Sequence, residues 1–296
     1  MTDELHIQSI ICDRLTVTGR LDWTKERNEH GEWQKKSIVL SKLFNPIEWQ
    51  ITRHADNDNG MYSDKFIVPI QEVGSSIFIQ VNRIYSDNRD FRVDFNPSKL
   101  NEKEISWLLN ILKRIKEKRV TRADMAVNFH HDLTTYKMTD GRQRSSVEFK
   151  DRYGNIETLY RGSRNSDNYL KIYNKKKERE SKYREVEHDW WRVEETIKDA
   201  KGNQWATYEW FKGIKLTNGV PTFGDDVKAT DKGNALSIMN NLMSLDEYSK
   251  NYRTKIKKII ESAVYTKELN LGEEIKKAPY QQMLNDALKG MQSFLD

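Results

Sequence analysis

The sequence predicts an α+β protein, with a mixed, largely antiparallel sheet, packed helices and a helical C-terminal part. Three observations support this class. Between residues 15 and 96, short apolar stretches alternate with polar turns, as is typical of strands. Further along, a strand–helix–strand pattern occurs twice. Beyond residue 234, apolar residues recur at helical spacing.

The composition restricts the kind of protein. A chain of 296 residues can form one large domain, or a main domain with a smaller appendage. Apolar residues make up 36% and charged residues 32%, but eight Trp, 13 Tyr and ten Phe exclude a disordered chain. The single cysteine, Cys12, excludes a disulfide framework. No apolar run approaches the ~20 residues of a membrane span, and the N-terminus lacks a signal-peptide pattern, so we expect a cytoplasmic protein.

The first half reads as strands followed by one helix. Strands are predicted at 15–23, 47–54, 65–71, 75–85 and 91–97, with a polar turn at 56–60. Asn101 and Glu104 form a capping box ahead of an apolar stripe, which predicts a helix ending near Lys118. A strand at 120–129 follows.

The second half repeats this pattern. Strands are predicted at 147–151, 157–164, 168–175 and 190–198, with a helix over the basic run 175–186. The two strand–helix–strand units, around 91–129 and 168–198, indicate a weak internal duplication. Each returning strand carries Arg-x-acid, first Arg122-Ala-Asp124 and then Arg192-Val-Glu194.

The C-terminal third predicts a change of architecture. A helical segment at 203–212 precedes a loop-like stretch, and three helical patterns follow. We therefore expect a main α+β domain at 1–212, a hinge at 213–233 and a helical part at 234–296.

Basic residues cluster more strongly than the net charge of +5 suggests. The runs 113–122, 175–184 and 252–260 suit contacts with phosphates, although any one of them is equally typical of a solvated helix face. Three such runs with intervening aromatic residues favour a nucleic-acid partner.

Several common chemistries are excluded. The sequence has no Walker-type loop, no G-x-G-x-x-G and no G-x-S-x-G. His130 and His131 are adjacent, so on a strand they point to opposite faces and cannot hold one metal together.

The stretch 168–175 carries the clearest candidate nucleophile. Alternation places four residues, Tyr169, Lys171, Tyr173 and Lys175, on one strand face. A phenol titrates near ~10, and nearby cations favour the phenolate while they neutralise phosphate charge. The pattern alone favours a structural role, since Tyr and Lys alternate on many solvated strands.

Two acids complete a possible metal site. Asp124 and Glu194 can hold one Mg²⁺ or Mn²⁺ if their strands are adjacent in the sheet. Ion pairs with the neighbouring arginines are an equally good interpretation. Asp94 is a weaker third candidate.

Three motifs within 120–198 carry a family resemblance. Gly-Ser-Arg-Asn-Ser-Asp at 162–167, Ile-Tyr-Asn-Lys-Lys at 172–176 and Trp-Arg-Val-Glu at 191–194 resemble the Rep-trans replication initiators of Gram-positive rolling-circle plasmids. The chain length and helical C-terminus agree with this, whereas the first hundred residues contribute little. Asn128 departs from the family, in which a second acid often stands there.

The resemblance implies a metal-dependent DNA nickase and strand transferase with ligase-like and topoisomerase-like activity. Such proteins nick supercoiled plasmid DNA at a hairpin in the double-strand origin. They form a covalent 5′-phosphotyrosine intermediate and leave a 3′-OH primer. They act as homodimers and recruit a host helicase, and their origin specificity lies toward the C-terminus. The family's active tyrosine corresponds to Tyr173, and Asp124 and Glu194 correspond to metal ligands.

The remaining candidate residues follow from this implication. Lys171, Lys175, Arg122 and Arg192 are expected to steady phosphates or the acids. Tyr169 is expected to be a supporting aromatic, because the two-tyrosine nickases place their pair on a helix beside a histidine-bound metal. The expected DNA contacts are Arg164, Tyr169, Lys176, Arg253, Lys255, Lys257, Lys258 and Lys267. Glu195 falls on the apolar strand face without explanation.

Two other functions stay open on the sequence. A non-catalytic DNA-binding regulator would show salt-sensitive binding without a metal requirement. A metal-dependent nuclease that uses water would leave free 5′ phosphates and form no covalent adduct.

Overall fold

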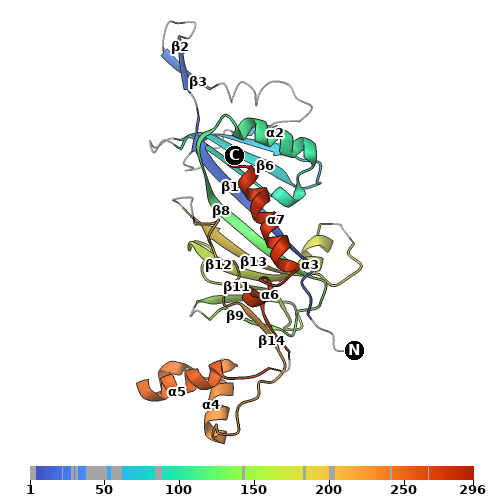
Figure 1. Cartoon of the computed structure of the whole chain (residues 1–296), viewed down its shortest axis with the longest axis vertical. Coiled ribbons are helices and arrows are strands. Elements are labelled where there is room, and N and C mark those ends of the chain that lie inside the picture. Colours follow the sequence, from blue (N-terminus) through green and yellow to red (C-terminus); the bar gives the residue numbers. More distant parts are fainter. Residues whose placement is uncertain are drawn as a thin grey trace. The chain divides into compact units, whose positions relative to one another are not determined.

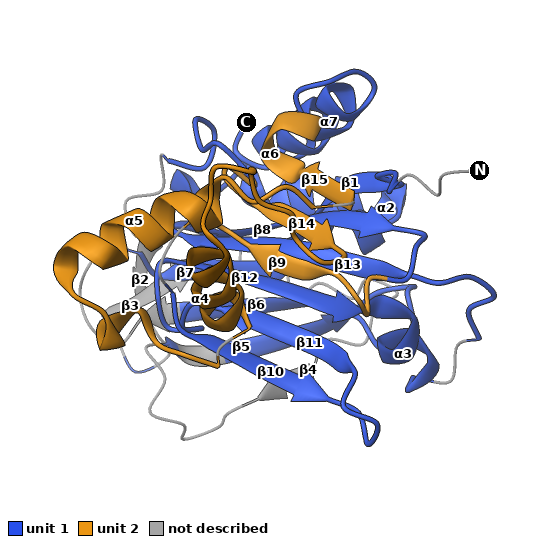
Figure 2. Ribbon diagram, turned by 90° about the horizontal axis from the view of Figure 1, so that it is seen from below, with its two compact units in different colours: residues 1–132, 143–210, 275–296 blue, residues 133–142, 211–274 orange. Residues whose placement is uncertain are grey.

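A computed structural model of the chain describes most of its residues, and they form two compact units (Figure 2). Unit 1 contains Met1–Asp132, Gln143–Trp210 and Ile275–Asp296, and unit 2 contains Leu133–Arg142 and Phe211–Glu274. The described residues are 5–21, 23–27, 30, 33–37, 52–54, 62–83, 89–141, 144–182, 185–199, 204–240, 242–265 and 267–296. The predicted turn at 56–60 and most of the predicted strand at 47–54 lie outside them.

Unit 1 is built on a ten-stranded sheet within the described residues. In spatial order its strands are β10 (Ser146–Lys150), β11 (Ile156–Arg161), β12 (Asn168–Asn174), β13 (Trp191–Lys198), β8 (Lys116–Phe129), β1 (Ser9–Arg20), β7 (Phe91–Phe95), β6 (Ser76–Arg83), β5 (Tyr62–Pro69) and β4 (Thr52–His54). Every neighbouring pair is antiparallel. A separate hairpin joins β2 (Trp23–Arg27) to β3 (Trp33–Ser37). The predicted α+β class is confirmed.

The central strands bury an apolar face and present a polar one, as period-2 alternation requires. Val127 on β8 pairs with Val193 on β13, and both are fully buried. Helix α7 (Tyr280–Ser293) packs along β1 (Figure 1), and the following Phe294 meets Phe95 edge-on at 4.8 Å between ring centroids. Phe95 and Asp94 are neighbours on β7, so they point to opposite faces of the sheet. Helix α7 therefore covers the apolar face, which carries Phe95, and does not cover the polar face, which carries Asp94.

Helix α2 (Glu102–Leu112) begins as predicted but ends earlier. The Asn101 side chain accepts a hydrogen bond from the Glu104 amide, and the Glu104 side chain accepts one from the Asn101 amide, which completes the capping box. The predicted end near Lys118 is wrong, because β8 already begins at Lys116, where it pairs with Arg20 of β1. Tertiary strand pairing here overrides the helical pattern.

Both predicted strand–helix–strand units are present. The first is β7–α2–β8, and the second is β12, α3 (Lys175–Glu180) and β13. Their returning strands β8 and β13 are neighbours, so the adjacency on which the metal hypothesis depends is confirmed. The duplication does not extend to strand pairing, because β12 pairs directly with β13 whereas β1 separates β7 from β8.

Unit 2 contains a three-stranded sheet and a helical hairpin. The sheet order is β15 (Lys267–Asn270), β14 (Lys215–Asn218) and β9 (Lys137–Thr139). Helices α4 (Ala229–Met239) and α5 (Lys250–Glu261) share a small core of Ala235, Ile256 and Ile259, and α6 (Leu271–Glu274) follows β15. Two single turns of 3₁₀ helix, Pro97–Lys99 in unit 1 and Leu245–Glu247 in unit 2, complete the described elements.

The units divide the chain differently from the predicted boundaries. The predicted helix at 203–212 forms turns over 204–212, where Trp205 and Trp210 are buried and Phe211 adopts a positive φ of 59°. The predicted hinge at 213–233 contains β14 and the start of α4. Helix α7, predicted to belong with the C-terminal helices, is part of unit 1 because its apolar face packs on the large sheet. None of the helices among the described residues is long and apolar enough to cross a membrane.

Candidate functional site

The polar face of the central strands lines a cavity of about 440 Å³ in unit 1. A neighbouring hollow of about 470 Å³ shares Asp13, Lys99 and Lys175 with it. The cavity brings together seven predicted residues from β8, β12, β13 and the turn after β11: Arg122, Asp124, Arg164, Tyr169, Lys171, Tyr173 and Glu194. Lys175 lines both hollows, and Arg192 lines the neighbouring one.

Tyr173 is buried between two lysines. The Lys171 ammonium lies 3.5 Å from the centroid of the Tyr173 ring, and Lys175 Nζ donates a hydrogen bond to the Tyr173 hydroxyl at 3.4 Å. Burial raises the pKa of Tyr173 well above its ordinary value, although the charge of Arg192, its cross-strand partner, acts in the opposite direction. Ionising this phenol therefore requires a group that accepts its proton.

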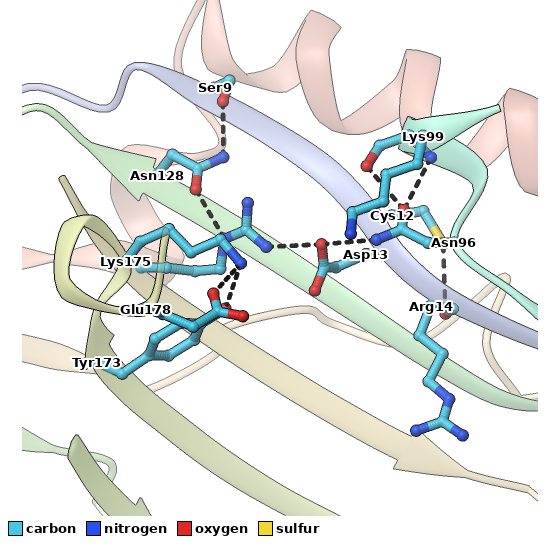
Figure 3. Close-up of polar contacts among 12 residues, drawn as sticks. Ser9, Cys12, Asp13, Arg14, Asn96, Lys99, Asn128, Tyr173, Lys175 and Glu178 are labelled. Atoms are coloured by element: carbon cyan, nitrogen blue, oxygen red, sulfur yellow. Dashed lines mark hydrogen bonds and ion pairs between the residues drawn. The ribbon is translucent and has the colours of Figure 1, made fainter. Parts of the chain in front are cut away.

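Lys175 begins helix α3, directly after β12 ends (Figure 3). The Asn174 side chain caps the helix by accepting a hydrogen bond from the Lys177 amide, and this turns the Lys175 side chain back toward Tyr173. Burial and the charge of Arg192 lower the pKa of Lys175 to about 8. Glu178 accepts a hydrogen bond from Lys175, and despite its burial the bonds from Lys175 and Lys182 lower the pKa of Glu178 to about 2.

A hydrogen-bonded chain orients Arg192. Its Nη1 donates to Asp13 Oδ1 at 2.6 Å, and its Nε donates to Asn128 Oδ1 at 2.8 Å. Asn128 donates in turn to the Ser9 hydroxyl at 2.8 Å (Figure 3). Asn128 therefore accepts the hydrogen bond from the Arg192 guanidinium as an uncharged residue.

Asp13 is a site residue that the sequence did not indicate. The β1–β8 register shifts between Cys12 and Arg14, which is a β-bulge. Strict alternation would have sent Asp13 to the apolar face with Leu15. The bulge instead places both Asp13 and Arg14 on the polar face, where both line the cavity. The positive charges of Arg192 and Lys175 lower the pKa of Asp13 in spite of its burial.

Asp124 and Glu194 lie diagonally across the β8–β13 pair, because Asp124 is opposite Thr196 and Glu194 is opposite Ala126. Asp124 accepts two hydrogen bonds from Arg122, at 2.8 and 2.7 Å, and Arg122 also donates to the Tyr169 hydroxyl at 3.0 Å. Glu194 accepts no hydrogen bond from the described residues. Burial raises the pKa of Glu194 to about 7, and the charges of Asp124 and Asp13 act in the same direction.

These carboxylates fit a hard divalent ion. Nothing among the described residues groups three or more His, Cys, Asp or Glu side chains around one metal position. Glu194 forms no ion pair among the described residues, and the nearby acids disfavour its charged form. A cation bound to Glu194 would stabilise that charge, and Asp124 would be the second ligand. Mg²⁺ is typically bound through one or two carboxylates plus water and substrate phosphate. Asp94 is too far away to share an ion with Glu194, because β8 and β1 separate its strand β7 from β13. Its two oxygens instead accept hydrogen bonds from Arg14 and Thr16 at 2.8 to 2.9 Å.

The predicted DNA contacts fall into two groups. Arg164 and Tyr169 line the cavity, whereas Lys176 does not, and its backbone amide bonds to the Trp190 carbonyl. The other five belong to unit 2. Arg253 pairs with Asp246 at 2.9 Å and Lys255 with Asp231 at 2.6 Å. Lys257 and Lys258 on α5 and Lys267 on β15 are exposed.

Further cavity residues went unpredicted. They are Arg14, Asn96, Lys99, Tyr160 and Glu178. Asn96 and Lys99 follow β7 in a turn, for which alternation gives no signal.

Glu195, unexplained by the sequence, is buried on the apolar face with polar partners. Its carboxylate accepts hydrogen bonds from the Tyr208 hydroxyl at 2.8 Å and from the Asn168 amide at 3.2 Å. Glu195 therefore joins β13 to Asn168 of β12 and to Tyr208 in the turns that follow β13.

Sequence comparison relates this chain to replication initiation proteins. No family model matches. A replication initiation protein from Staphylococcus aureus is 30% identical over 191 residues, 62% of this chain and 59% of the relative. Another from the same organism is 36% identical over 136 residues, 44% of this chain and 43% of the relative. The chain thus matches about three fifths of the length of such relatives at most.

A solved structure, the rolling circle replication initiator protein from Geobacillus stearothermophilus, aligns with 88% of this chain and 99% of its own. Its TM-score is 0.40 and its sequence identity 14%, a likeness too weak to support a structural argument. The sequence relatives alone confirm the predicted resemblance to replication initiators.

Proposed function

We propose that this protein initiates rolling-circle replication of a plasmid by nicking one strand of its origin, with Tyr173 as the nucleophile. One observation carries the proposal: Tyr173 is buried between Lys171 and Lys175 on the wall of a polar cavity that also contains a carboxylate pair. A phenol placed among cations and acids has the surroundings that attack on a phosphodiester needs.

Lys175 is the group that takes the proton from Tyr173. Its pKa of about 8 leaves roughly a tenth of the amine neutral at pH 7, and its Nζ lies 3.4 Å from the Tyr173 hydroxyl oxygen. As the proton moves to Lys175, the tyrosine oxygen forms a bond to phosphorus and the bond to the 3′ oxygen breaks. The 3′ oxygen takes a proton from water and leaves as the 3′-OH primer.

Rejoining reverses these steps. The 3′-OH gives its proton back to the solvent as its oxygen attacks the phosphotyrosine, the bond between the tyrosine oxygen and phosphorus breaks, and the Lys175 ammonium returns its proton to the phenolate. The neighbouring cations Lys171 and Arg192 stabilise the phenolate in both directions.

Asp124 and Glu194 are the residues that would hold Mg²⁺ or Mn²⁺, and the ion would neutralise charge on the phosphoryl oxygens. Arg122 keeps the Asp124 carboxylate in place through its two hydrogen bonds. Arg164, exposed at the cavity rim, is suited to bind a flanking phosphate.

The partners in this proposal are supercoiled origin DNA that extrudes a hairpin, a second copy of the chain and a host helicase. The exposed lysines of α5 are suited to contact the origin duplex outside the nicked region. A cytoplasmic location follows from this role.

The deciding experiment incubates the protein with supercoiled origin plasmid and Mg²⁺, followed by denaturing electrophoresis. Wild type should form a covalent protein–DNA adduct, and Tyr173→Phe should form none. Tyr153→Phe, in an exposed turn, is the matched control and should form the adduct normally. An adduct with Tyr173→Phe would disprove the assignment of the nucleophile. Free 5′ phosphates without any adduct would show a nuclease that uses water, and salt-sensitive binding without any cleavage would show a regulator.

A further inference from the structure

The hairpin β10–β11 forms one edge of the large sheet and continues the face that carries Tyr173. Val147 of β10 is opposite Tyr160 of β11, and Tyr160 is opposite Lys171 of β12. One step along, Phe149 is opposite Thr158, and Thr158 is opposite Tyr173. Cross-strand partners share a face, so Phe149 lies on the same face as Tyr173, two strands away.

This part of the face is apolar and open. Val147 and Phe149 are each 53% exposed, although large apolar side chains usually avoid solvent in such a row. The Phe149 ring meets the Tyr160 ring edge-on, with centroids 6.0 Å apart. We call Val147, Phe149 and Tyr160 the β10–β11 platform.

Cations border the platform on the side of the cavity. The Arg164 guanidinium lies 4.1 Å from the centroid of the Tyr160 ring, and Lys171 lies 5.9 Å from it. The turn that carries Arg164 is fixed by Gly162, whose φ of 87° favours glycine and whose amide donates to the Ser145 carbonyl at 2.8 Å. The platform, Arg164 and Tyr173 therefore form one continuous surface.

We propose that the β10–β11 platform binds the unpaired bases of single-stranded DNA next to the phosphate that Tyr173 attacks. This inference rests on the proposed function. Bases stack on exposed aromatic rings whatever their sequence, while nearby cations bind the phosphates between them. A duplex keeps the faces of its bases stacked on one another, so only an unpaired strand offers them to the platform.

Charge and continuity favour this occupant over a protein surface. The platform consists of three side chains, Arg164 and Lys171 border it, and Tyr160 itself also lines the cavity that contains Tyr173. On the opposite face of β10, Glu148 and Lys150 form an ion pair at 3.0 Å, so the apolar character is confined to the face of Tyr173.

The test measures fluorescence anisotropy of the full-length protein with a labelled single-stranded 20-nucleotide DNA of mixed sequence and with the corresponding duplex. Phe149→Leu keeps an apolar side chain but removes the ring, and should weaken single-strand binding roughly 5- to 100-fold. Phe149→Trp should restore it, and neither variant should alter duplex binding. Tyr153→Leu, which removes an exposed aromatic from the turn of the same hairpin, is the matched control and should bind like wild type.

Other results would overturn the proposal. Equal single-strand binding by Phe149→Leu and wild type would show that the ring does not stack on bases. If Phe149→Leu lost self-association in sedimentation but bound DNA as wild type does, the platform would be an interface between two copies of the chain. The adduct assay separates the two proposals. If wild type forms the adduct but Phe149→Leu binds single-stranded DNA as wild type does, the proposal for the platform is refuted and the nicking function is not. Absence of any adduct, with weakened single-strand binding by Phe149→Leu, refutes the nicking function alone.

Discussion

Arg192 on β13 and Asp13 on β1 are joined by a 2.6 Å hydrogen bond that spans the intervening strand β8. The Arg192 side chain is only 4% exposed, so Asp13 is the counter-charge of a buried cation. Removing one partner of such a pair leaves an uncompensated buried charge, which destabilises a protein by roughly 3–5 kcal/mol.

Asp13→Asn should therefore lower the free energy of unfolding by about 3 kcal/mol in urea denaturation. The control is the double variant Asp13→Asn, Arg192→Gln, in which no buried charge is left without a partner. Its loss of unfolding free energy should be smaller than the sum of the losses of the two single variants. Additive losses would show that the two side chains are not energetically coupled.

Glu194 should make the metal-free protein less stable as the pH rises. Its pKa is about 7 in the folded chain against an ordinary 4.5, so between these values the folded protein binds more protons than the unfolded chain. The free energy of unfolding therefore falls as the pH rises from about 4.5 to 7. Glu194→Gln removes the effect and should be more stable than wild type at pH 8, by on the order of 1–3 kcal/mol, and equally stable near pH 4.

Thermal unfolding with and without MgCl₂ extends this prediction to the metal. Mg²⁺ should raise the Tm of wild type at pH 8 and leave that of Glu194→Gln unchanged, because the ligand is missing. An equal rise in both proteins would remove Glu194 from the metal site.

Lys175 should determine how adduct formation depends on pH. The neutral amine accepts the proton, so the rate should rise with pH and level off above about 8, the pKa of Lys175. Lys175→Arg keeps the charge but cannot accept a proton at these pH values, and should be slower by roughly a hundred-fold or more at pH 8.5. Lys171→Arg, which alters the cation above the ring, should be slower but still level off near pH 8. A plateau retained by Lys175→Arg would point to another proton acceptor.

The exposed lysines of α5 should contribute to DNA binding through phosphates. Replacing Lys257 and Lys258 by Gln should weaken the binding of origin duplex. It should also reduce the slope of log K against log salt by about 2, because each lost phosphate contact lowers the slope by about 0.9. Lys289→Gln, on an exposed position of α7 in unit 1, is the control and should leave the slope unchanged. An unaltered slope in the α5 variant would exclude this helix from the DNA interface.

Much of the site follows from local alternation. Period-2 spacing correctly placed Tyr169, Lys171 and Tyr173 on one face, and the two Arg-x-acid strands are neighbours in the sheet. These features were predictable because a strand with one buried face specifies its register strongly.

Other features depend on tertiary structure and were not predictable. A single extra residue in β1 turns Asp13 into the cavity, and a bulge has no sequence signal here. Lys175 belongs to a basic run that is typical of a solvated helix, yet the capped first turn buries its amine against Tyr173. The early end of α2 reflects a strand partner that lies about a hundred residues earlier in the chain.

The division of the chain into units has a practical consequence for dissecting the protein. The chain leaves unit 1 at Asp132 and again at Trp210, and it returns each time, finally with α7 and Phe294 packed against the sheet. A stop codon after the α4–α5 hairpin would thus not delete a module but would uncover the apolar side of the large sheet. Replacing unit 2 as a whole calls for exchanging two internal segments, Leu133–Arg142 and Phe211–Glu274, with the last 22 residues left in place.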